Sequence, residues 1–484
     1  MIFDNLEPPK IWSYFEEICK IPRLSKNEEK IRQYLLDFAE KHGLQSKTDK
    51  AGNMLITKSA HPEYNKRKSV LLQSHMDMVG EKDAKTEHDW TKDPISPYID
   101  GKCVKAKDTT LGADDGIGIA AQIALLSDNE IKTGPIECLF TVDEESGMTG
   151  AIELEENFFD SKILINLDSE DEGELFIGCA GGIDTVAEMP YEKEEPDGDH
   201  VALKISITGL HGGHSGDEIH KGYANSVKMM TGLLQILSSK YKIRLSTFNG
   251  GNLRNAIPRE AFAYISCDKD HVDKIRKDSE QYLEKMREEY ASTEKGISIT
   301  VSKTGHPSFV IDHKSHKSLL NALDQCPHGV VAWSEEMKGL VETSTNLASV
   351  KFKDGDIRIV TSQRSSVDSA KKEISGQVYD IFTENNAIAQ HSGGYPGWKP
   401  DTNSEILNIT RRSYEKLFKT TPVVRAIHAG LECGLILEKY PGLDMISFGP
   451  TIKGAHTPQE RLDIETTKKF WDLLVDVLRN IPSN

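Results

Sequence analysis

The chain has 484 residues, of which 37% are hydrophobic and 28% are charged, and this composition is typical of a globular protein that folds in water. Its 59 Lys and Arg residues against 76 Asp and Glu residues give a net charge of −17, which argues against a nucleic-acid partner and against an anionic membrane surface. No apolar run approaches the roughly 18 residues that are needed to span a bilayer. The N-terminal residues show no export signal, and the seven cysteines are scattered without a CxxC pair, so we expect reduced thiols in a cytoplasmic protein.

The first predicted element is a helix over residues 25–43. Ser25 and Glu28 have the spacing of a capping box, apolar residues then recur at helical spacing, and Gly43 follows the last of them. Four short apolar runs come later, at residues 70–72, 136–142, 163–167 and 445–448. Because apolar strands that alternate with helices are typical of a parallel sheet buried on both faces, we expect an α/β fold with a mostly parallel sheet covered by helices.

Two stretches interrupt this pattern. Residues 187–200 are acidic and contain two prolines, as a linker does, and residues 392–397 are rich in turn-forming Gly and Pro. The segment between them has alternating strands and two long charged helices, after which the sheet pattern resumes. We therefore predict one domain made of residues 1–186 and 396–484, with an α+β domain of residues 187–395 inserted into it.

The insert also contains a weak internal repeat. An Asn, an extended segment and a helix follow one another after Arg254 and again after Thr345. The pattern favours an internal duplication slightly over a coincidence.

Acidic and histidine residues follow the ends of the predicted strands. They are His75 and Asp77, Asp114 in a glycine-rich junction, Glu144 and Glu145, Asp168, and His456 near the C-terminus. In open α/β sheets the ligand crevice lies beyond the carboxyl ends of the strands, so these side chains can converge. Each of them alone would usually be a helix cap or a solvated charge. Together, imidazole and carboxylate without thiolate favour a site for zinc, manganese or cobalt.

The spacing within this set suggests distinct roles. In His75-x-Asp77 a carboxylate can hold the ring of a metal-ligating histidine. Glu144 and Glu145 are adjacent and cannot point the same way along an extended segment, so one is expected to bind metal and the other to act as general base. Asp114 lies where a carboxylate could bridge two ions.

Seven segments in this order resemble those of the M20 metallopeptidases, and most of all the branch of aminoacyl-histidine dipeptidases: HMD, GADDGIG, DEESGMTGA, LINLDSE, GGHSG, RNAIP and GAHTP. The likeness extends over nearly the whole chain and includes residues 395–400 and 427–433. It implies a metallo-dipeptidase that hydrolyses unblocked dipeptides, including Xaa-His, in a cytoplasmic homodimer. It also implies two divalent ions per subunit, zinc or alternatively cobalt or manganese.

The resemblance further assigns five metal ligands, with Asp114 as the bridge between two ions. His75 and Asp168 complete one site, and Glu145 and His456 complete the other.

Three catalytic roles are also implied by the resemblance. Asp77 would orient His75, Glu144 would be the general base, and residues 187–395 would form a lid. His214, in the GGHSG segment of the lid, would stabilise the oxyanion. The resemblance leaves open whether His214 acts within its own chain or in a partner subunit.

Two charged residues are candidates for the ends of a dipeptide. Arg364 would bind the substrate carboxylate, because a guanidinium pairs bidentately with it. Taken alone, Arg364 could equally well be an ordinary arginine at the surface. Asn255, in the RNAIP segment, would assist from the same side. Glu432, in an apolar stretch, would hold the α-ammonium, because a buried carboxylate is costly unless it is paired.

Two alternatives remain open. An M20 aminoacylase or deacylase would act on N-acyl amino acids, and an ammonium-binding Glu432 argues against it. The second alternative is a homologue that binds peptides without cleaving them. The presence of Glu144 and of all five metal ligands argues against this alternative.

Overall fold

The computed structural model describes residues 2–305 and 307–483, and the chain forms two compact units. Unit 1 consists of Met1–Cys179, Pro400–Ala426 and Leu431–Asn484. Unit 2 consists of Ala180–Lys399 and Ile427–Gly430. The predicted insert of residues 187–395 lies inside unit 2, which also takes in the short segment 427–430 that the sequence analysis assigned to the other domain.

Unit 1 contains an eight-stranded sheet in the order β1-β2-β6-β3-β7-β21-β8-β20. The strands are β1 (Gln45–Thr48), β2 (Met54–Lys58), β3 (Val70–His75), β6 (Ile136–Thr141), β7 (Ile163–Asn166), β8 (Glu174–Cys179), β20 (Val423–Ile427) and β21 (Asp444–Ser447). The four central strands β6, β3, β7 and β21 are parallel, which confirms the expected arrangement for the centre of the sheet. The pairs β1–β2, β2–β6 and β21–β8 are antiparallel. A short turn joins β1 to β2, and a short turn can only return the chain antiparallel.

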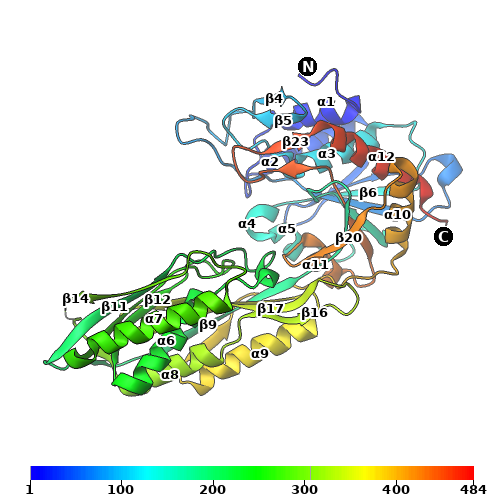
Figure 1. Cartoon of the computed structure of the whole chain (residues 1–484). Coiled ribbons are helices and arrows are strands. Elements are labelled where there is room, and N and C mark those ends of the chain that lie inside the picture. The colour runs from blue at the N-terminus through cyan, green and yellow to red at the C-terminus, as the bar shows by residue number, and fades with distance from the viewer. Residues whose placement is uncertain (1, 306, 484) are drawn as a thin grey trace. The chain divides into compact units, whose positions relative to one another are not determined.

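Helices cover both faces of this sheet. Every residue of β3, β6 and β7 is buried, as expected for apolar strands with a layer on each side. The helices are α1 (Pro9–Ile18), α2 (Glu29–Lys41), α3 (Ala113–Ser127), α4 (Glu144–Gly147), α5 (Thr149–Glu153), α10 (Glu405–Phe418), α11 (Glu432–Lys439) and α12 (Ile464–Asn480). In Figure 1, α1, α3 and α12 lie on one side of the sheet, and α5 and α11 lie on the other. A small second sheet has the order β22 (Ile452–Lys453), β23 (Arg461–Asp463), β5 (Cys103–Ala106) and β4 (Pro97–Asp100).

The helix predicted over residues 25–43 is α2, and its predicted capping box is wrong. The helix begins four residues after Ser25, whose hydroxyl donates instead to the Asp77 carboxylate at 2.8 Å. The Glu28 carboxylate accepts from the backbone N–H of Asp143 at 3.0 Å. Both side chains that the sequence pattern predicts as helix caps are therefore hydrogen-bonded to residues from other parts of the chain. The predicted C-terminus is confirmed, because Gly43 has a φ of 64° just after the last turn.

Unit 2 is built on a nine-stranded sheet with helices on one face (Figure 1). The strands are β9 (Gly181–Pro190), β11 (His200–Thr208), β12 (Arg244–Gly250), β13 (Ala261–Asp268), β14 (Ser298–Thr304), β16 (Gly329–Trp333), β17 (Val341–Phe352), β18 (Asp356–Ser365) and β19 (Ile388–His391), and β10 (Lys193–Glu194) pairs with β15 (Val310–Ile311) apart from them. The helices are α6 (Ser226–Tyr241), α7 (Val272–Glu289), α8 (His313–Gln325) and α9 (Asp368–Glu384). Short 3-10 turns occur at Pro62–Tyr64 in unit 1 and at Ile219–Lys221 and Lys269–His271 in unit 2.

The predicted linker over residues 187–200 is wrong in its first part. Strand β9 continues to Pro190, with Ala187 and Met189 buried and Glu188 between them exposed. This alternation is the period of a strand with one face against the core, and the acidic residues that follow it masked it in the sequence.

The two halves of unit 2 share one topology. The first half runs β11-α6-β12-β13-α7-β14, and the second runs β9-α8-β17-β18-α9-β19. In both, the strand order across the sheet is fourth, first, third, second, and the halves join where Gly250 of β12 pairs with Val350 of β17. A duplicated lid would have this architecture. The two Asn of the sequence repeat are not equivalent, however, because Asn255 lies between strands and Asn346 lies inside β17.

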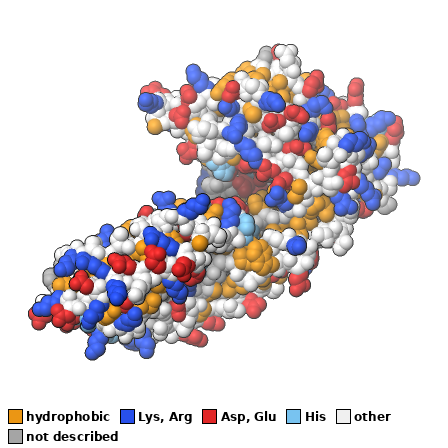
Figure 2. Space-filling view, viewed as in Figure 1, with side chains coloured by type: hydrophobic (Ala, Val, Ile, Leu, Met, Phe, Trp, Pro, Cys, Tyr) orange, Lys and Arg blue, Asp and Glu red, His pale blue; other side chains and the backbone are white. Residues whose placement is uncertain are grey.

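Within the described residues, no helix combines the length and the apolar character that a membrane crossing requires. On the face shown in Figure 2, Lys and Arg side chains are interspersed with Asp and Glu side chains.

Truncation of a side chain in the central sheet tests how much unit 1 depends on it. Phe140 on β6 is completely buried, so Phe140→Ala is expected to lower the free energy of unfolding of unit 1 by about 3–5 kcal/mol through lost contacts and a cavity. Urea titration followed by circular dichroism measures the change. The matched control is Ile152→Ala on α5, where the side chain is 48% exposed and the expected change is within about 0.5 kcal/mol. Equal losses for the two variants would contradict the proposed core.

Candidate active site

The carboxyl ends of the parallel strands in unit 1 carry a cluster of histidine and acidic residues. His75 is the last residue of β3, Glu144 and Glu145 open α4 just after β6, and Asp168 follows β7. Parallel strands end at the same edge of a sheet, so the order of the elements alone brings these residues to one place. Asp114 joins them from the start of α3.

The first group in this cluster consists of His75, Asp114 and Asp168. Nε2 of His75 lies 3.0 Å from Oδ1 of Asp114 and 3.3 Å from Oδ1 of Asp168. The histidine is 1% exposed, and each carboxylate side chain is 11% exposed. These three ligand atoms lie within 4.8 Å of one another.

The second group consists of Asp114, Glu145 and His456. Nε2 of His456 lies 3.2 Å from Oδ2 of Asp114 and 3.0 Å from Oε2 of Glu145. Asp114 therefore presents one carboxylate oxygen to each group. Its neighbour Asp115 belongs to neither, because its Oδ1 accepts from the backbone N–H of Gly118 at 3.0 Å.

Opposite charges are strongly coupled in this cluster. Burial acts to raise the pKa of Asp114, but hydrogen bonds from His456 and His75 hold it well below its ordinary value. Burial also raises the pKa of Asp168 well above its usual range, helped by the carboxylates of Asp114 and Glu144 and opposed by His75. Hydrogen bonds to Asp114 and Glu145 raise the pKa of His456 to about 11.

Asp77 connects the histidine of β3 to the two glutamates of α4. Its Oδ1 lies 3.3 Å from Nδ1 of His75 and accepts from the backbone N–H of Glu144 at 3.0 Å, while its Oδ2 accepts from the N–H of Glu145 at 3.2 Å. Asp77 is fully buried. Burial acts to raise its pKa, but the hydrogen bond and charge of His75 lower it to about 2, so the group is a carboxylate at neutral pH.

The side chain of Glu144 faces the same cluster. A carboxylate oxygen of Glu144, one of Glu145 and a ring nitrogen of His75 lie within 4.8 Å of one another. Burial raises the pKa of Glu144 to about 8, and the carboxylates of Glu432 and Glu145 act in the same direction, against His75. The two adjacent glutamates thus differ in their contacts, because Glu145 reaches His456 and Glu144 does not.

Two buried charged residues that no sequence pattern indicated hold the loops of this cluster. The Glu460 carboxylate, 2% exposed, accepts from the backbone N–H groups of Leu111, Gly112 and Ala113 at 2.7, 3.0 and 2.7 Å. Arg23, also 2% exposed, donates to the carbonyl oxygens of Met76 and Asp77 at 3.0 and 2.6 Å, and to that of Gly112.

These contacts fix the loops that carry the cluster. Glu460 ties the loop of His456 to the loop of Asp114, and Arg23 ties the loop of Asp77 to that same loop. In the sequence, Glu460 is recognisable only as a charged residue close to the motif of His456. Arg23 is recognisable only as a charged residue with apolar neighbours. Neither signal specifies a partner.

Glu432 lies in unit 1, below the strand ends. It is 1% exposed, and its Oε2 accepts from Nε2 of Gln73 and from the hydroxyl of Thr141, both at 2.7 Å. Its Oε1 has no hydrogen-bond partner in the described part of the chain. Burial raises its pKa to about 8. The sequence predicted apolar surroundings for Glu432, but Gln73 and Thr141 make one side of them polar.

His214 and Asn255 are neighbours in unit 2. The segment of His214 pairs with Ala256, and the N–H of Ser215 donates to the carbonyl of Asn255 at 2.8 Å. Nδ1 of His214 accepts from the N–H groups of Gly216 and Asp217 at 3.2 and 3.1 Å. A neutral ring with this pattern carries its proton on Nε2, and that N–H can donate to a ligand.

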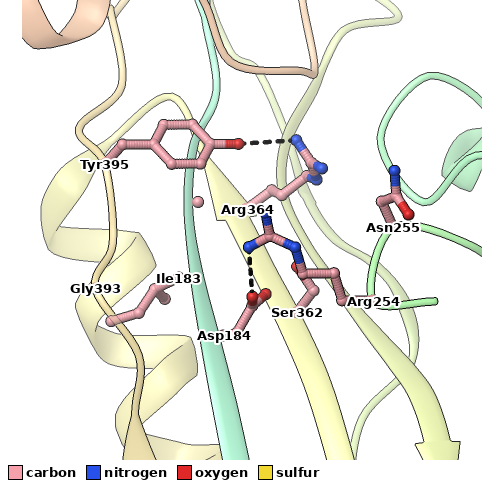
Figure 3. A pocket seen from close by; sticks show the side chains of 9 residues that line it. Ile183, Asp184, Arg254, Asn255, Ser362, Arg364, Gly393 and Tyr395 are labelled. Carbon is pink, nitrogen blue, oxygen red and sulfur yellow. Dashed lines mark hydrogen bonds and ion pairs between the residues drawn. The ribbon is translucent and has the colours of Figure 1, made fainter. Parts of the chain in front are cut away.

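Arg364 lies nearby on β18 in unit 2. Burial lowers the pKa of His214, the carboxylate of Asp217 opposes this, and the guanidinium of Arg364 lowers it further. Arg364 is 9% exposed, and with Asn255 it lines a small cavity of about 90 Å³ (Figure 3). His428, from the same motif as Glu432, also lies in unit 2, where its Nε2 is 2.7 Å from the Ser344 hydroxyl.

Comparisons with known proteins agree on a family. The family model described as peptidase family M20/M25/M40 matches residues 71–480. The cytosol non-specific dipeptidase of Escherichia coli K12 is 42% identical over 479 residues, which cover 99% of each chain. The crystal structure of aminoacylhistidine dipeptidase from Vibrio alginolyticus superposes with a TM-score of 0.96 at 41% identity, covering 100% of this chain and 98% of that one.

A more distant structure shares the fold alone. Aminopeptidase PepT from Bacillus cereus has a TM-score of 0.57 at 17% identity, over 98% of this chain and 99% of that one. The family match covers most of the sequence, and the Escherichia coli relative is similar over almost the whole of it. The chain belongs to peptidase family M20/M25/M40.

Proposed function

We propose that the chain is a metal-dependent dipeptidase that hydrolyses unblocked dipeptides, Xaa-His among them. The Escherichia coli relative, 42% identical, and the Vibrio alginolyticus relative, 41% identical, are both named as dipeptidases. The observation that carries the proposal is the pair of ligand groups that share Asp114 at the carboxyl edge of the parallel sheet. The name of the Escherichia coli relative supports a cytoplasmic location, and the family resemblance of the sequence supports a homodimer, which light scattering on the purified chain would test.

The donor atoms of the two groups fit two divalent ions. His75, Asp114 and Asp168 would hold one ion, and Asp114, Glu145 and His456 the other. Imidazole and carboxylate donors without thiolate suit zinc, and also cobalt and manganese. Nε2 of His75 faces the carboxylates while its Nδ1 faces Asp77, which is the usual support of a metal-ligating histidine. The closely spaced carboxylates repel one another, and divalent cations would relieve this repulsion.

When bound, the ions would polarise the scissile carbonyl and lower the pKa of water. Glu144 would take a proton from the attacking water and return it to the leaving amine. Asp77 would keep His75 oriented and hold the backbone of Glu144 in place. His214 would donate its Nε2–H to the oxyanion that forms on the carbonyl oxygen.

Two charged residues would select the substrate. Arg364, with Asn255 beside it in the cavity of unit 2, would bind the C-terminal carboxylate. Glu432 would hold the free ammonium through Oε1, the oxygen without a protein partner. An N-acyl amino acid has no ammonium, so this assignment distinguishes a dipeptidase from an aminoacylase.

Replacement of the general base gives the sharpest test of the mechanism. Glu144→Gln keeps the size of the side chain but removes the proton acceptor, so kcat for Ala-His should fall by about 10²–10⁴. Metal content, measured by elemental analysis, should stay at that of the wild type. Glu153→Gln, an exposed glutamate on α5, is the matched control and should leave both unchanged. A kcat within a few-fold of wild type for Glu144→Gln would show that another group is the base.

Removal of the proposed oxyanion donor should act on the chemical step. His214→Ala is expected to lower kcat by about 10²–10³ and to change KM much less. His211→Ala in the same loop is the control, because that exposed ring stacks on Tyr223 with centroids 4.1 Å apart. The proposed role is wrong if the two variants have similar kcat, or if His214→Ala acts mainly on KM.

Substrate length tests the two charged residues together. If Arg364 and Glu432 bind the two ends, a tripeptide or a C-terminal amide leaves a buried charge unpaired, and kcat/KM should be lower by about a hundredfold or more. The substrates are Ala-His, its amide, Ala-Ala-His and an N-acetyl amino acid. Arg364→Ala should remove most of the preference over the amide while metal content is unchanged. Arg358 lies on the same strand, is partly exposed and pairs with Glu188, so Arg358→Ala should leave the preference intact. Comparable kcat/KM for Ala-His, its amide and Ala-Ala-His would rule out recognition of both ends.

A further inference from the structure

Among the described residues, the guanidinium of Arg364 makes one hydrogen bond, at the cavity of unit 2. Its Nη1 donates to the hydroxyl oxygen of Tyr395 at 3.1 Å (Figure 3). Its buried Nε has no hydrogen-bond partner among the described residues. A buried N–H without a partner is costly, so this edge of the guanidinium is suited to an incoming acceptor.

The charges that line the cavity also favour an anion. Two guanidinium groups and one carboxylate face it, those of Arg364, Arg254 and Asp184. Arg254 is paired with Asp184 at 2.7 Å. No acidic side chain lies within ion-pair distance of Arg364 in the described ranges 2–305 and 307–483, so the positive charge of Arg364 is the one left for a ligand.

Tyr395 is itself held firmly in place. A methyl group on Gly182 would come within 2.8 Å of the Tyr395 ring, and one on Gly430 within 2.7 Å, so only glycine at both positions leaves room for the ring. The backbone of Tyr395 exchanges two hydrogen bonds with Gly182, at 2.9 and 3.1 Å. Nζ of Lys371 donates to the Tyr395 carbonyl at 2.5 Å.

The hydrogen bond to Arg364 and the fixed position of the ring together suggest a role for Tyr395. A long arginine side chain loses much rotational freedom when it binds a carboxylate, and a fixed acceptor on one edge removes part of that loss in advance. We propose that Tyr395 is a positioning residue that orients Arg364 and thereby sets the selectivity for peptides with a free C-terminal carboxylate. The inference rests on the proposed function, in which Arg364 binds that carboxylate.

The test compares kcat and KM for Ala-His and for its C-terminal amide. Tyr395→Phe removes only the hydroxyl, so KM for Ala-His should rise about tenfold, as expected for the loss of one hydrogen bond to a charged group. The kcat for Ala-His should stay within about twofold, because the carboxylate that Arg364 would bind takes no part in the bond cleavage. Both constants for the amide should be unchanged, so the ratio of kcat/KM between acid and amide falls. Gly182→Ala should lower the same ratio by displacing the ring.

Tyr191→Phe is the matched control, because the hydroxyl of Tyr191 donates to the Lys353 carbonyl at 2.7 Å elsewhere in unit 2. It should leave the ratio at the wild-type value. In the double variant Tyr395→Phe/Arg364→Ala the ratio should equal that of Arg364→Ala alone, because the tyrosine acts through the arginine.

Failure of this inference can be separated from failure of the proposed function. If Arg364→Ala lowers the ratio and Tyr395→Phe does not, the positioning role is overturned and the role of Arg364 stands. If Arg364→Ala also leaves the ratio unchanged, the carboxylate role of Arg364 is overturned together with the inference. A Tyr395→Phe variant that loses rate equally on both substrates would have a general structural defect, and this result too would overturn the positioning role.

Discussion

The shared carboxylate of Asp114 is the contact on which the candidate site depends. One oxygen faces His75 and the other faces His456, so two histidines that are far apart in the sequence meet on a single side chain. That geometry is possible only if the loop before α3 is held in register with the strand ends. Glu460 accepts from three consecutive N–H groups of this loop, and Arg23 donates to its Gly112 carbonyl. Two buried charged side chains thus hold this loop in place. Each makes several hydrogen bonds, which compensate for the loss of hydration on burial.

The close packing of acidic residues in the candidate site makes their ionised forms less favourable. Burial raises the pKa of Asp168, Glu144 and Glu432, since each of these carboxyl groups lies in a poorly solvated region with other acids nearby. The imidazole of His75 opposes this effect at all three carboxyl groups, and the hydroxyl of Thr141 opposes it at Glu432 as well. A site with such an excess of carboxylates over imidazoles is matched to divalent cations, and perturbed pKa values of this kind are typical of functional sites.

The candidate residues of unit 2 are held in place by other kinds of contact. His214 and Asn255 come from two loops that pair with each other, and Arg364 comes from a strand in the second of the two halves that share one topology. Close packing onto glycine fixes the side chain beside Arg364, where Gly182 and Gly430 admit the ring of Tyr395. Polar side chains are therefore oriented in unit 1 mainly by buried charge and in unit 2 mainly by backbone pairing and shape.

Much of this could be predicted from the sequence. Apolar strands that alternate with helices determined the parallel centre of the sheet, and residues at the strand ends had to meet because parallel strands finish at one edge. The convergence of the histidine and acidic residues could be anticipated in this way. Their division into two groups that share Asp114 was implied by the resemblance to the family. These are consequences of order along the chain, which local patterns record.

Other features were decided only by the tertiary structure. Ser25 and Glu28 form no helix cap because Asp77 and Asp143 reach them from distant parts of the chain. Glu460 and Arg23 had no recognisable pattern, since their partners are backbone groups up to 349 positions away. The division of residues 427–433 between two units was equally hidden. Hydrogen bonds between distant segments depend on where the chain returns in space, and a single sequence carries no local signal for that return.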